Sequence, residues 1–239
     1  MTVGYDSRII QQNLTFDVGR SEIFIIMGTS GCGKSTLMRS AIGLVKPQRG
    51  HILYQGESFW DAAPERRQEL MTDVGVMYQS SALWSGLSLA ENVTLPLTQI
   101  GGLDPGEADD IAELKLALVG LSGFEDYYPA EVSGGMRKRA AIARAIALDP
   151  QVLFLDEPSA GLDPISSRLL DDLTVQLRDS LGTTMIMVTH ELPTILGIGD
   201  NSVFLDTETR TMLASGNPRR LKEECGNNKV RQFLSRSTA

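Results

Sequence analysis

Four short runs of apolar residues divide the chain, at residues 23–27, 74–78, 152–155 and 184–189. Runs without polar alternation are typical of strands buried on both faces, as in a parallel sheet. Helical periodicity follows or separates them, most clearly at residues 36–44, 107–119 and 164–180. This order predicts an α/β fold with a mostly parallel sheet.

The strand signal fades in the middle of the chain. Residues 84–150 have helical periodicity, which predicts a mostly helical subdomain inserted into a core made of residues 1–83 and 151–216. Residues 3–18 read as short strands with a turn at Asp6 and Ser7, which gives an N-terminal antiparallel β portion. Residues 202–206 and 210–215 predict a hairpin at the sheet edge, and residues 217–239 a helical tail.

A glycine-rich stretch lies between the first buried strand and the first helix. We call it the glycine loop: Gly28, Thr29, Ser30, Gly31, Cys32, Gly33, Lys34, Ser35 and Thr36. Strand, glycine loop and helix form the context in which backbone N–H groups and the helix dipole bind phosphate. Lys34 reaches the β- and γ-phosphates in such a loop, and the Ser35 hydroxyl is a candidate ligand for Mg²⁺. We also expect the loop to lower the thiol pKa of Cys32.

Polar residues follow the other buried strands at their carboxyl ends, where ligands bind to open parallel sheets. Gln79 is a candidate to hold a metal or a water, and Asp156 a candidate ligand for Mg²⁺. Glu157 is suited to act as the general base that activates water, and His190 to contact the γ-phosphate.

The Ser-Gly-Gly segment at residues 133–135 and the aromatic residue Tyr5 are further candidates to bind a nucleotide. Ser133, Gly134 and Gly135, here called the Ser-Gly-Gly segment, open a helix and present a second anion-binding end. The basic residues 137–139 behind them fit either a nucleic-acid patch or a phosphate-proximal or solvated helix face. The ring of Tyr5 is a candidate to stack on adenine, the alternative being that it packs on the sheet edge.

Composition narrows the setting. The 239 residues carry a net charge of −8 with a pI near 4.9, which argues against nucleic acid as a partner. The 2 cysteines, Cys32 and Cys225, form no disulfide framework, which suits a reducing cytosol. We find neither an apolar run long enough to span a bilayer nor a signal peptide, so we expect a soluble chain for which any membrane span comes from another protein.

With these motifs in this order, the chain resembles the ATP-binding subunit of an ABC transporter. The resemblance implies a P-loop NTPase (RecA-like) core, ATP and Mg²⁺ as ligands, and a head-to-tail homodimer with two ATP molecules at its interface. Each site would take the glycine loop of one protomer and, in trans, the Ser-Gly-Gly segment and Asp163 of the other. Met136 replaces the commoner Gln of the family's signature, Ser21 stands where Gly is usual, and the strand expected before Tyr5 is nearly absent.

Within that family the stretches at 79–97, 132–139 and 157–164 resemble the Mla-like ATPases of MCE-type lipid transport systems. This implies an integral-membrane permease and an MCE-domain lipid-binding protein as partners, and a place on the cytoplasmic face of the inner membrane. The alternatives are the ATPase of a small-solute importer and a soluble ABC ATPase that does not act in transport.

Two apolar surfaces leave alternatives open. Leu83, Trp84 and Leu87 either receive a cytoplasmic helix of the permease or pack inside the helical subdomain. Val230, Phe233 and Leu234 lie on one face of a short helix, which either packs on its own core or grips the partner protomer, as the Mla resemblance suggests.

Overall fold

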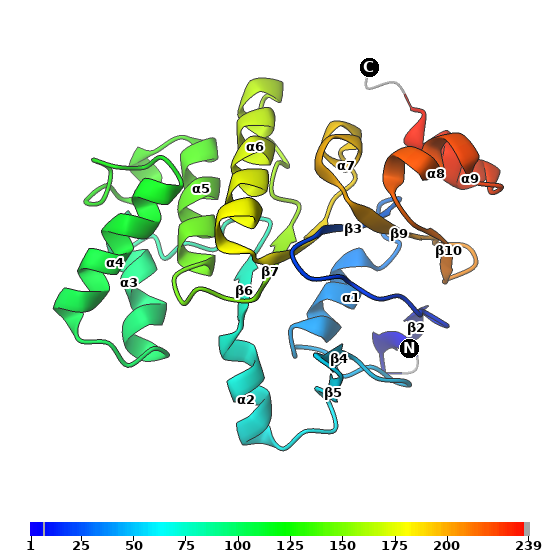
Figure 1. Cartoon of the computed structure of the whole chain (residues 1–239), viewed down its shortest axis with the longest axis horizontal. Coiled ribbons are helices and arrows are strands. Elements are labelled where there is room, and N and C mark those ends of the chain that lie inside the picture. Colours follow the sequence, from blue (N-terminus) through cyan, green and yellow to red (C-terminus); the bar gives the residue numbers. More distant parts are fainter. Residues whose placement is uncertain (7, 237–239) are drawn as a thin grey trace. The chain divides into compact units, whose positions relative to one another are not determined.

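Strand β3 (Ile23–Gly28) is fully buried and lies at the centre of a sheet in the computed structural model, which describes residues 1–6 and 8–236 (Figure 1). It pairs in parallel with β8 (Thr184–Val188) on one side and β9 (Asn201–Leu205) on the other. β10 (Met212–Ser215) runs antiparallel to β9 and forms the predicted hairpin. The predominantly parallel arrangement predicted from the apolar runs is confirmed.

The chain forms two compact units, which we describe separately. The first unit comprises Met1–Met71 and Thr184–Ala239, and the second comprises Thr72–Thr183. Helices α3, α4 and α5 of the second unit lie within the range 84–150 that the sequence predicts to be helical.

In the first unit, α1 (Lys34–Ala41) follows β3 after the glycine loop. Helix α7 (Leu192–Ile198) packs against β3. The N-terminal hairpin is short: β1 (Val3–Tyr5) pairs antiparallel with β2 (Arg8–Gln11). The predicted turn includes Ser7, which lies outside the described residues. The smaller elements β4 (Leu53–Tyr54), β5 (Glu57–Ser58) and α2 (Pro64–Thr72) complete this part of the chain, α2 ending at the boundary of the unit.

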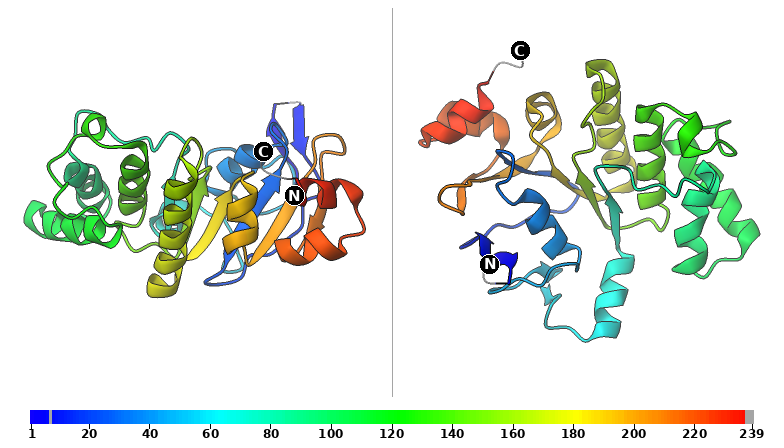
Figure 2. Two further views of the ribbon diagram at one scale, coloured as in Figure 1. Left: turned by 90° about the horizontal axis from the view of Figure 1, so that it is seen from above. Right: turned by 180° about the vertical axis from the view of Figure 1, so that it is seen from behind.

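In the second unit, β6 (Val74–Met77) and β7 (Val152–Asp156) pair in parallel, with Met77 opposite Leu155. The helices of this unit are α3 (Leu89–Gln99), α4 (Pro105–Leu118), the 3₁₀ turn η1 (Pro129–Glu131), α5 (Gly134–Ala145) and α6 (Pro164–Leu181). Helices α3, α4 and α5, drawn in green, pack on one another (Figure 2). Ser88, Asp104, Ser133 and Asp163 cap α3 to α6, so local sequence determines where each of these helices starts.

The tail forms two helices, α8 (Pro218–Glu224) and α9 (Asn228–Leu234), which pack on each other. The apolar face of α9 is buried inside the first unit: Val230 is 0% exposed, Leu234 1% and Phe233 4%. The Phe233 ring meets Phe204 of β9 edge-on, with ring centroids 5.1 Å apart. The prediction that this face grips a partner protomer is wrong, because these side chains already fill the core of their own chain.

Candidate functional site

The glycine loop of the first unit has backbone positions that only glycine fits. Gly28 has a φ of 150°, and a Cβ there would lie 2.4 Å from the carbonyl oxygen of Leu205 and 2.7 Å from Sγ of Cys32. Gly33 has a φ of 98°, and its Cβ would lie 2.5 Å from Cγ2 of Ile10. Strands β9 and β2 therefore hold the loop tightly from both sides, which fixes its backbone for binding.

Lys34 is the first residue of α1 and only 8% exposed. Its Nζ donates to the carbonyl oxygens of Gly28 at 3.2 Å and Thr29 at 3.4 Å. A buried ammonium held over the loop, beside the N-terminus of a helix, is a positive site suited to phosphate. The residues present therefore fit the phosphate groups of a nucleotide, and Ser35 and Thr36 follow on the same helix.

Cys32 differs from the sequence prediction. Its side chain is 1% exposed, and burial raises the thiol pKa above its ordinary value, although Lys34 acts in the opposite direction. The prediction of a lowered thiol pKa is therefore wrong: burial disfavours the thiolate, and this effect outweighs the positive charge of Lys34.

Tyr5 and His190 belong to the same unit as the glycine loop. Tyr5, at the end of β1, is 40% exposed, and Arg39 of α1 donates to its Oη at 3.3 Å, which lowers the pKa of the phenol. The strand that the sequence predicts to be nearly absent is β1, which has 3 residues and ends at Tyr5. His190 follows β8 and is exposed, with its Nε2 3.6 Å from Oε1 of Glu191. Adenine stacking and γ-phosphate contact stay predictions.

In the second unit, three predicted residues lie at the ends of β6 and β7. Gln79 follows β6, while Asp156 ends β7 and is followed by Glu157, which is 8% exposed. Lys138 of α5 joins them: its Nζ donates to the carbonyl oxygen of Gln79, and to that of Glu157 at 3.5 Å. Burial lowers the pKa of Lys138, and the carboxylates of Asp156 and Glu157 oppose that shift.

Sequence reasoning missed Lys138 because it treated residues 137–139 as one basic cluster, facing phosphate or solvent. Lys138 is in fact 7% exposed. A signal was present: Lys138 shares one helical face with Ala141 and Ile142, at spacings of three and four residues, and both are buried.

The Ser-Gly-Gly segment and Asp163 both lie at helix starts of the second unit. Oγ of Ser133 accepts from the N–H of Met136 at 3.2 Å, and Asp163 accepts from the N–H groups of Ile165 and Ser166, each at 3.0 Å. The hydrogen bonds from Ser166 lower the pKa of Asp163. A Cβ on Gly134 would have no neighbour nearer than 3.8 Å in the described chain, and one on Gly135 none nearer than 3.9 Å, so packing within this chain does not require glycine at either position.

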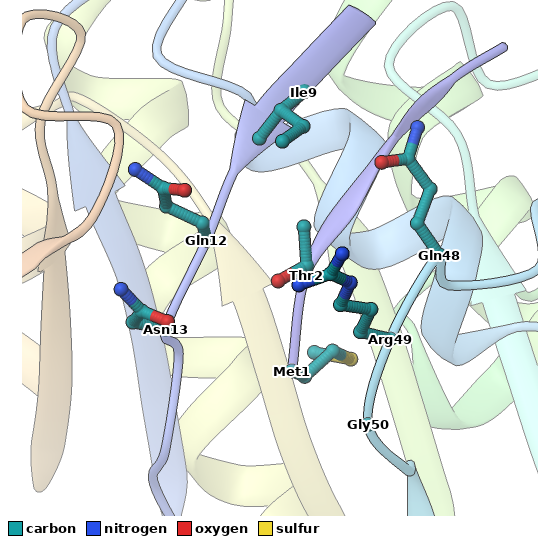
Figure 3. A pocket seen from close by; sticks show the side chains of 8 residues that line it. All are labelled: Met1, Thr2, Ile9, Gln12, Asn13, Gln48, Arg49 and Gly50. Carbon is teal, nitrogen blue, oxygen red and sulfur yellow. The ribbon is translucent and has the colours of Figure 1, made fainter. Parts of the chain in front are cut away.

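A polar cavity of about 330 Å³ lies elsewhere in the first unit (Figure 3). The predicted site residues do not line it; it is lined by Met1, Thr2, Ile9, Gln12, Asn13, Gln48, Arg49 and Gly50. Among the described residues, no group of three or more His, Cys, Asp or Glu side chains is arranged to hold a metal ion. Within the same residues, no helix combines the length and the apolar character that crossing a membrane requires.

The family model and the similar proteins all point to ATP-binding proteins of transport systems. The model of the family described as "ABC transporter" matches residues 11–160. The chain is 37% identical over 235 residues to "Probable ribonucleotide transport ATP-binding protein mkl" of Mycobacterium leprae, an alignment that covers 98% of this chain and 67% of that protein. It is 36% identical over 228 residues to "Intermembrane phospholipid transport system ATP-binding protein MlaF" of Escherichia coli, with coverage of 95% and 84%. The chain thus spans about two thirds of the length of mkl.

Solved structures agree with the fold. CbiO1 from Clostridium perfringens, part of the ABC transporter complex cbiONQ, has a TM-score of 0.83 at 28% identity. The superposition covers 93% of this chain and 90% of the CbiO1 chain. MJ0796, an ATP-binding cassette solved as a dimer in a post-hydrolysis state with ADP and Pi, has a TM-score of 0.78 at 27% identity, with coverage of 90% and 94%. With its glycine loop, its strand-end carboxylates and this likeness over nearly the whole chain, the protein belongs to the ABC transporter family as an ATP-binding subunit that hydrolyses ATP with Mg²⁺.

Proposed function

We propose that this protein powers the transport of phospholipid through a membrane permease. The observation that supports this most directly is the 36% identity to MlaF over 95% of the chain, since MlaF is named as part of an intermembrane phospholipid transport system. The protein would work as a homodimer on the cytoplasmic face of the inner membrane, attached through the permease. An MCE-domain protein would bind the lipid, and nucleic acid has no part in this function.

In this proposal each residue has a defined task. The glycine loop of one protomer holds the phosphates, with Lys34 supplying positive charge, and Tyr5 stacks on the adenine. Ser35, Gln79 and Asp156 would hold Mg²⁺, which neutralises phosphate charge when it is bound. Glu157 takes a proton from the attacking water, and His190 contacts the γ-phosphate.

The partner protomer completes each site with its Ser-Gly-Gly segment and Asp163. The open space around Gly134 and Gly135 supports this part of the proposal. Glycine there leaves backbone N–H groups accessible to an approaching phosphate, and the N-terminus of α5 favours an anion. MJ0796, a cassette solved as a dimer with ADP and Pi, supports a dimeric assembly by analogy.

Transport of a small polar solute is the second candidate, and one observation favours it: mkl is named for ribonucleotide transport. A soluble ABC ATPase without a transport role is the third candidate, and the names of mkl and MlaF both favour transport instead. The cargo is recognised outside the nucleotide motifs, so these motifs suit all three functions equally.

Reconstitution with the permease distinguishes these three candidate functions. The protein should hydrolyse ATP faster in liposomes together with its native permease than it does alone. The reconstituted complex should move labelled phospholipid between membranes only with hydrolysable ATP. Ribonucleotide uptake without phospholipid movement would favour the second function instead. The third function would be favoured if no co-encoded membrane protein bound this protein or stimulated its ATP hydrolysis.

A further inference from the structure

Lys138 joins two parts of the proposed site that sequence alone leaves separate. It lies in the first turns of α5, and its ammonium contacts the backbone carbonyls of both Gln79 and Glu157. These partners precede and follow it by 59 and 19 residues. A buried ammonium is costly unless hydrogen bonds compensate it, so the two carbonyls and Lys138 hold one another in place.

The two carbonyls belong to equivalent positions just after the neighbouring strands β6 and β7. Met77 of β6 pairs with Leu155 of β7 in parallel register, so Gln79 and Glu157 each lie two residues beyond that pair. Glu157 also has a left-handed backbone with a φ of 47°, a conformation that residues other than glycine rarely adopt. The backbone conformation at each position sets the direction of its side chain, so a contact that holds both carbonyls also sets where both side chains point.

A second cation of α5 holds the same loop further along. Arg144 donates to the carbonyl oxygens of Ser81 at 2.9 Å and Ala82 at 2.7 Å. Ser81 and Ala82 are left-handed as well, with φ of 65° and 49°. The contacts of Arg144 therefore shape the segment after Gln79, whereas the contacts of Lys138 include both Gln79 and Glu157.

We propose that Lys138 is a positioning residue for ATP hydrolysis, which holds the backbones of Gln79 and Glu157 so that their side chains meet water and metal correctly. This inference rests on the proposed roles of Gln79 and Glu157. The same contact would also allow the Ser-Gly-Gly segment to influence ATP hydrolysis in its own protomer. That segment starts α5, so a shift of the helix reaches Glu157 through the Lys138 contact.

The test compares full-length Lys138→Met with Lys115→Met as a matched control. Lys115 of α4 is a buried lysine of the same unit, 4% exposed and paired with Asp149 at 2.5 Å. For Lys138→Met we expect kcat to fall by at least about tenfold, with the KM for ATP and the Kd of Mg-ATP changing by less than about threefold, because misaligned groups slow chemistry more than binding. Lys138→Arg should restore most of the kcat, and Lys115→Met should lose thermal stability with its kcat nearly unchanged.

Three outcomes would overturn the inference: a parental kcat in Lys138→Met, an equal loss of kcat in Lys115→Met, or a raised KM at unchanged kcat. If Lys138→Met does not fold, Lys138→Gln replaces it, since a neutral and shorter side chain should lower kcat in the same way, and parental turnover there would equally overturn the inference. Glu157→Gln is assayed in parallel. Parental hydrolysis by Glu157→Gln would remove the proposed base and this inference with it, whereas slow Glu157→Gln beside fast Lys138→Met would remove the inference alone.

Discussion

Glu157 is buried, and its backbone is left-handed with a φ of 47°. Such a conformation in a residue other than glycine costs of order 1–3 kcal/mol, and outliers of this kind gather at functional sites. The contact from Lys138 to its carbonyl helps to hold the strained conformation. The strain thus lies on the residue that we propose as the general base.

The first prediction at the residue scale concerns this base. Glu157→Gln keeps the size and burial of the side chain but cannot accept a proton from water. We expect it to bind Mg-ATP as the parent does and to hydrolyse it at least about 10²-fold more slowly, the usual scale for a lost general base. Lys34→Ala should instead weaken nucleotide binding. Equilibrium binding and steady-state hydrolysis distinguish the two, and hydrolysis by Glu157→Gln at the parental rate would contradict the assignment.

At the scale of elements, α9 is attached to the first unit by an ion pair as well as by its apolar face. Lys229, at the start of α9, pairs with Asp206, which follows β9 and is 1% exposed. The Gln11 side chain bridges the carbonyl oxygens of Asp206 at 2.8 Å and Cys32 at 2.6 Å, so this region continues into the glycine loop. Deleting residues 227–239, of which 237–239 lie outside the described chain, would therefore remove part of the core rather than a separable tail.

Asp206 makes the attachment of α9 sensitive to pH. Burial would raise its pKa, but hydrogen bonds from Lys229 and Thr209 outweigh burial and lower the pKa to about 2. A carboxyl group with a lower pKa in the folded state stabilises the fold at pH values above its unfolded pKa. That stabilisation is lost as the pH falls from about 4 towards 2.

Lys229→Met should remove this contribution. We expect the variant to be less stable than the parent at pH 7, and the difference between them to shrink as the pH falls from about 4 towards 2, where Asp206 becomes protonated. Urea unfolding over that pH range measures the difference. Lys222→Met, an exposed position on α8, is the control and should match the parent at every pH. A stability difference that stays constant down to pH 2 would contradict the assigned ion pair.

At the scale of the whole molecule, the prediction concerns the proposed dimer. If each site takes the glycine loop of one protomer and the Ser-Gly-Gly segment of the other, a mixed dimer of two differently damaged protomers contains one intact site. Lys34→Ala damages the first element, and Gly135→Glu places a like charge against the phosphates. The Cβ of the new side chain has room in its own chain, where its nearest neighbour would be 3.9 Å away.

Each variant alone should hydrolyse ATP slowly, and mixing the two should recover part of the activity. Hydrolysis by purified mixed dimers carrying two different tags measures this. As a control, mixing Lys34→Ala with Lys34→Ala that carries the other tag should recover no activity. If the mixed dimer stays as inactive as its parents, each site is made within a single protomer and the head-to-tail proposal fails.

Much of the fold and many candidate residues follow from short stretches of sequence. Unbroken apolar runs predict buried parallel strands, and capping residues such as Ser133 and Asp163 predict helix starts, because both signals act over a few neighbouring positions. The glycine loop is recognisable for the same reason. The placement of Gln79, Glu157 and His190 after buried strands required only the rule that ligands bind at the carboxyl ends of parallel strands.

The tertiary structure decided what depends on distant segments. Cys32 has a raised thiol pKa because it is buried, and Lys138 is a buried cation because the carbonyls of Gln79 and Glu157 converge on it. The apolar face of α9 packs on its own chain because Phe204 offers it a surface. Burial is a property of everything that surrounds a side chain, and in each case the surrounding atoms come from residues far away in the sequence.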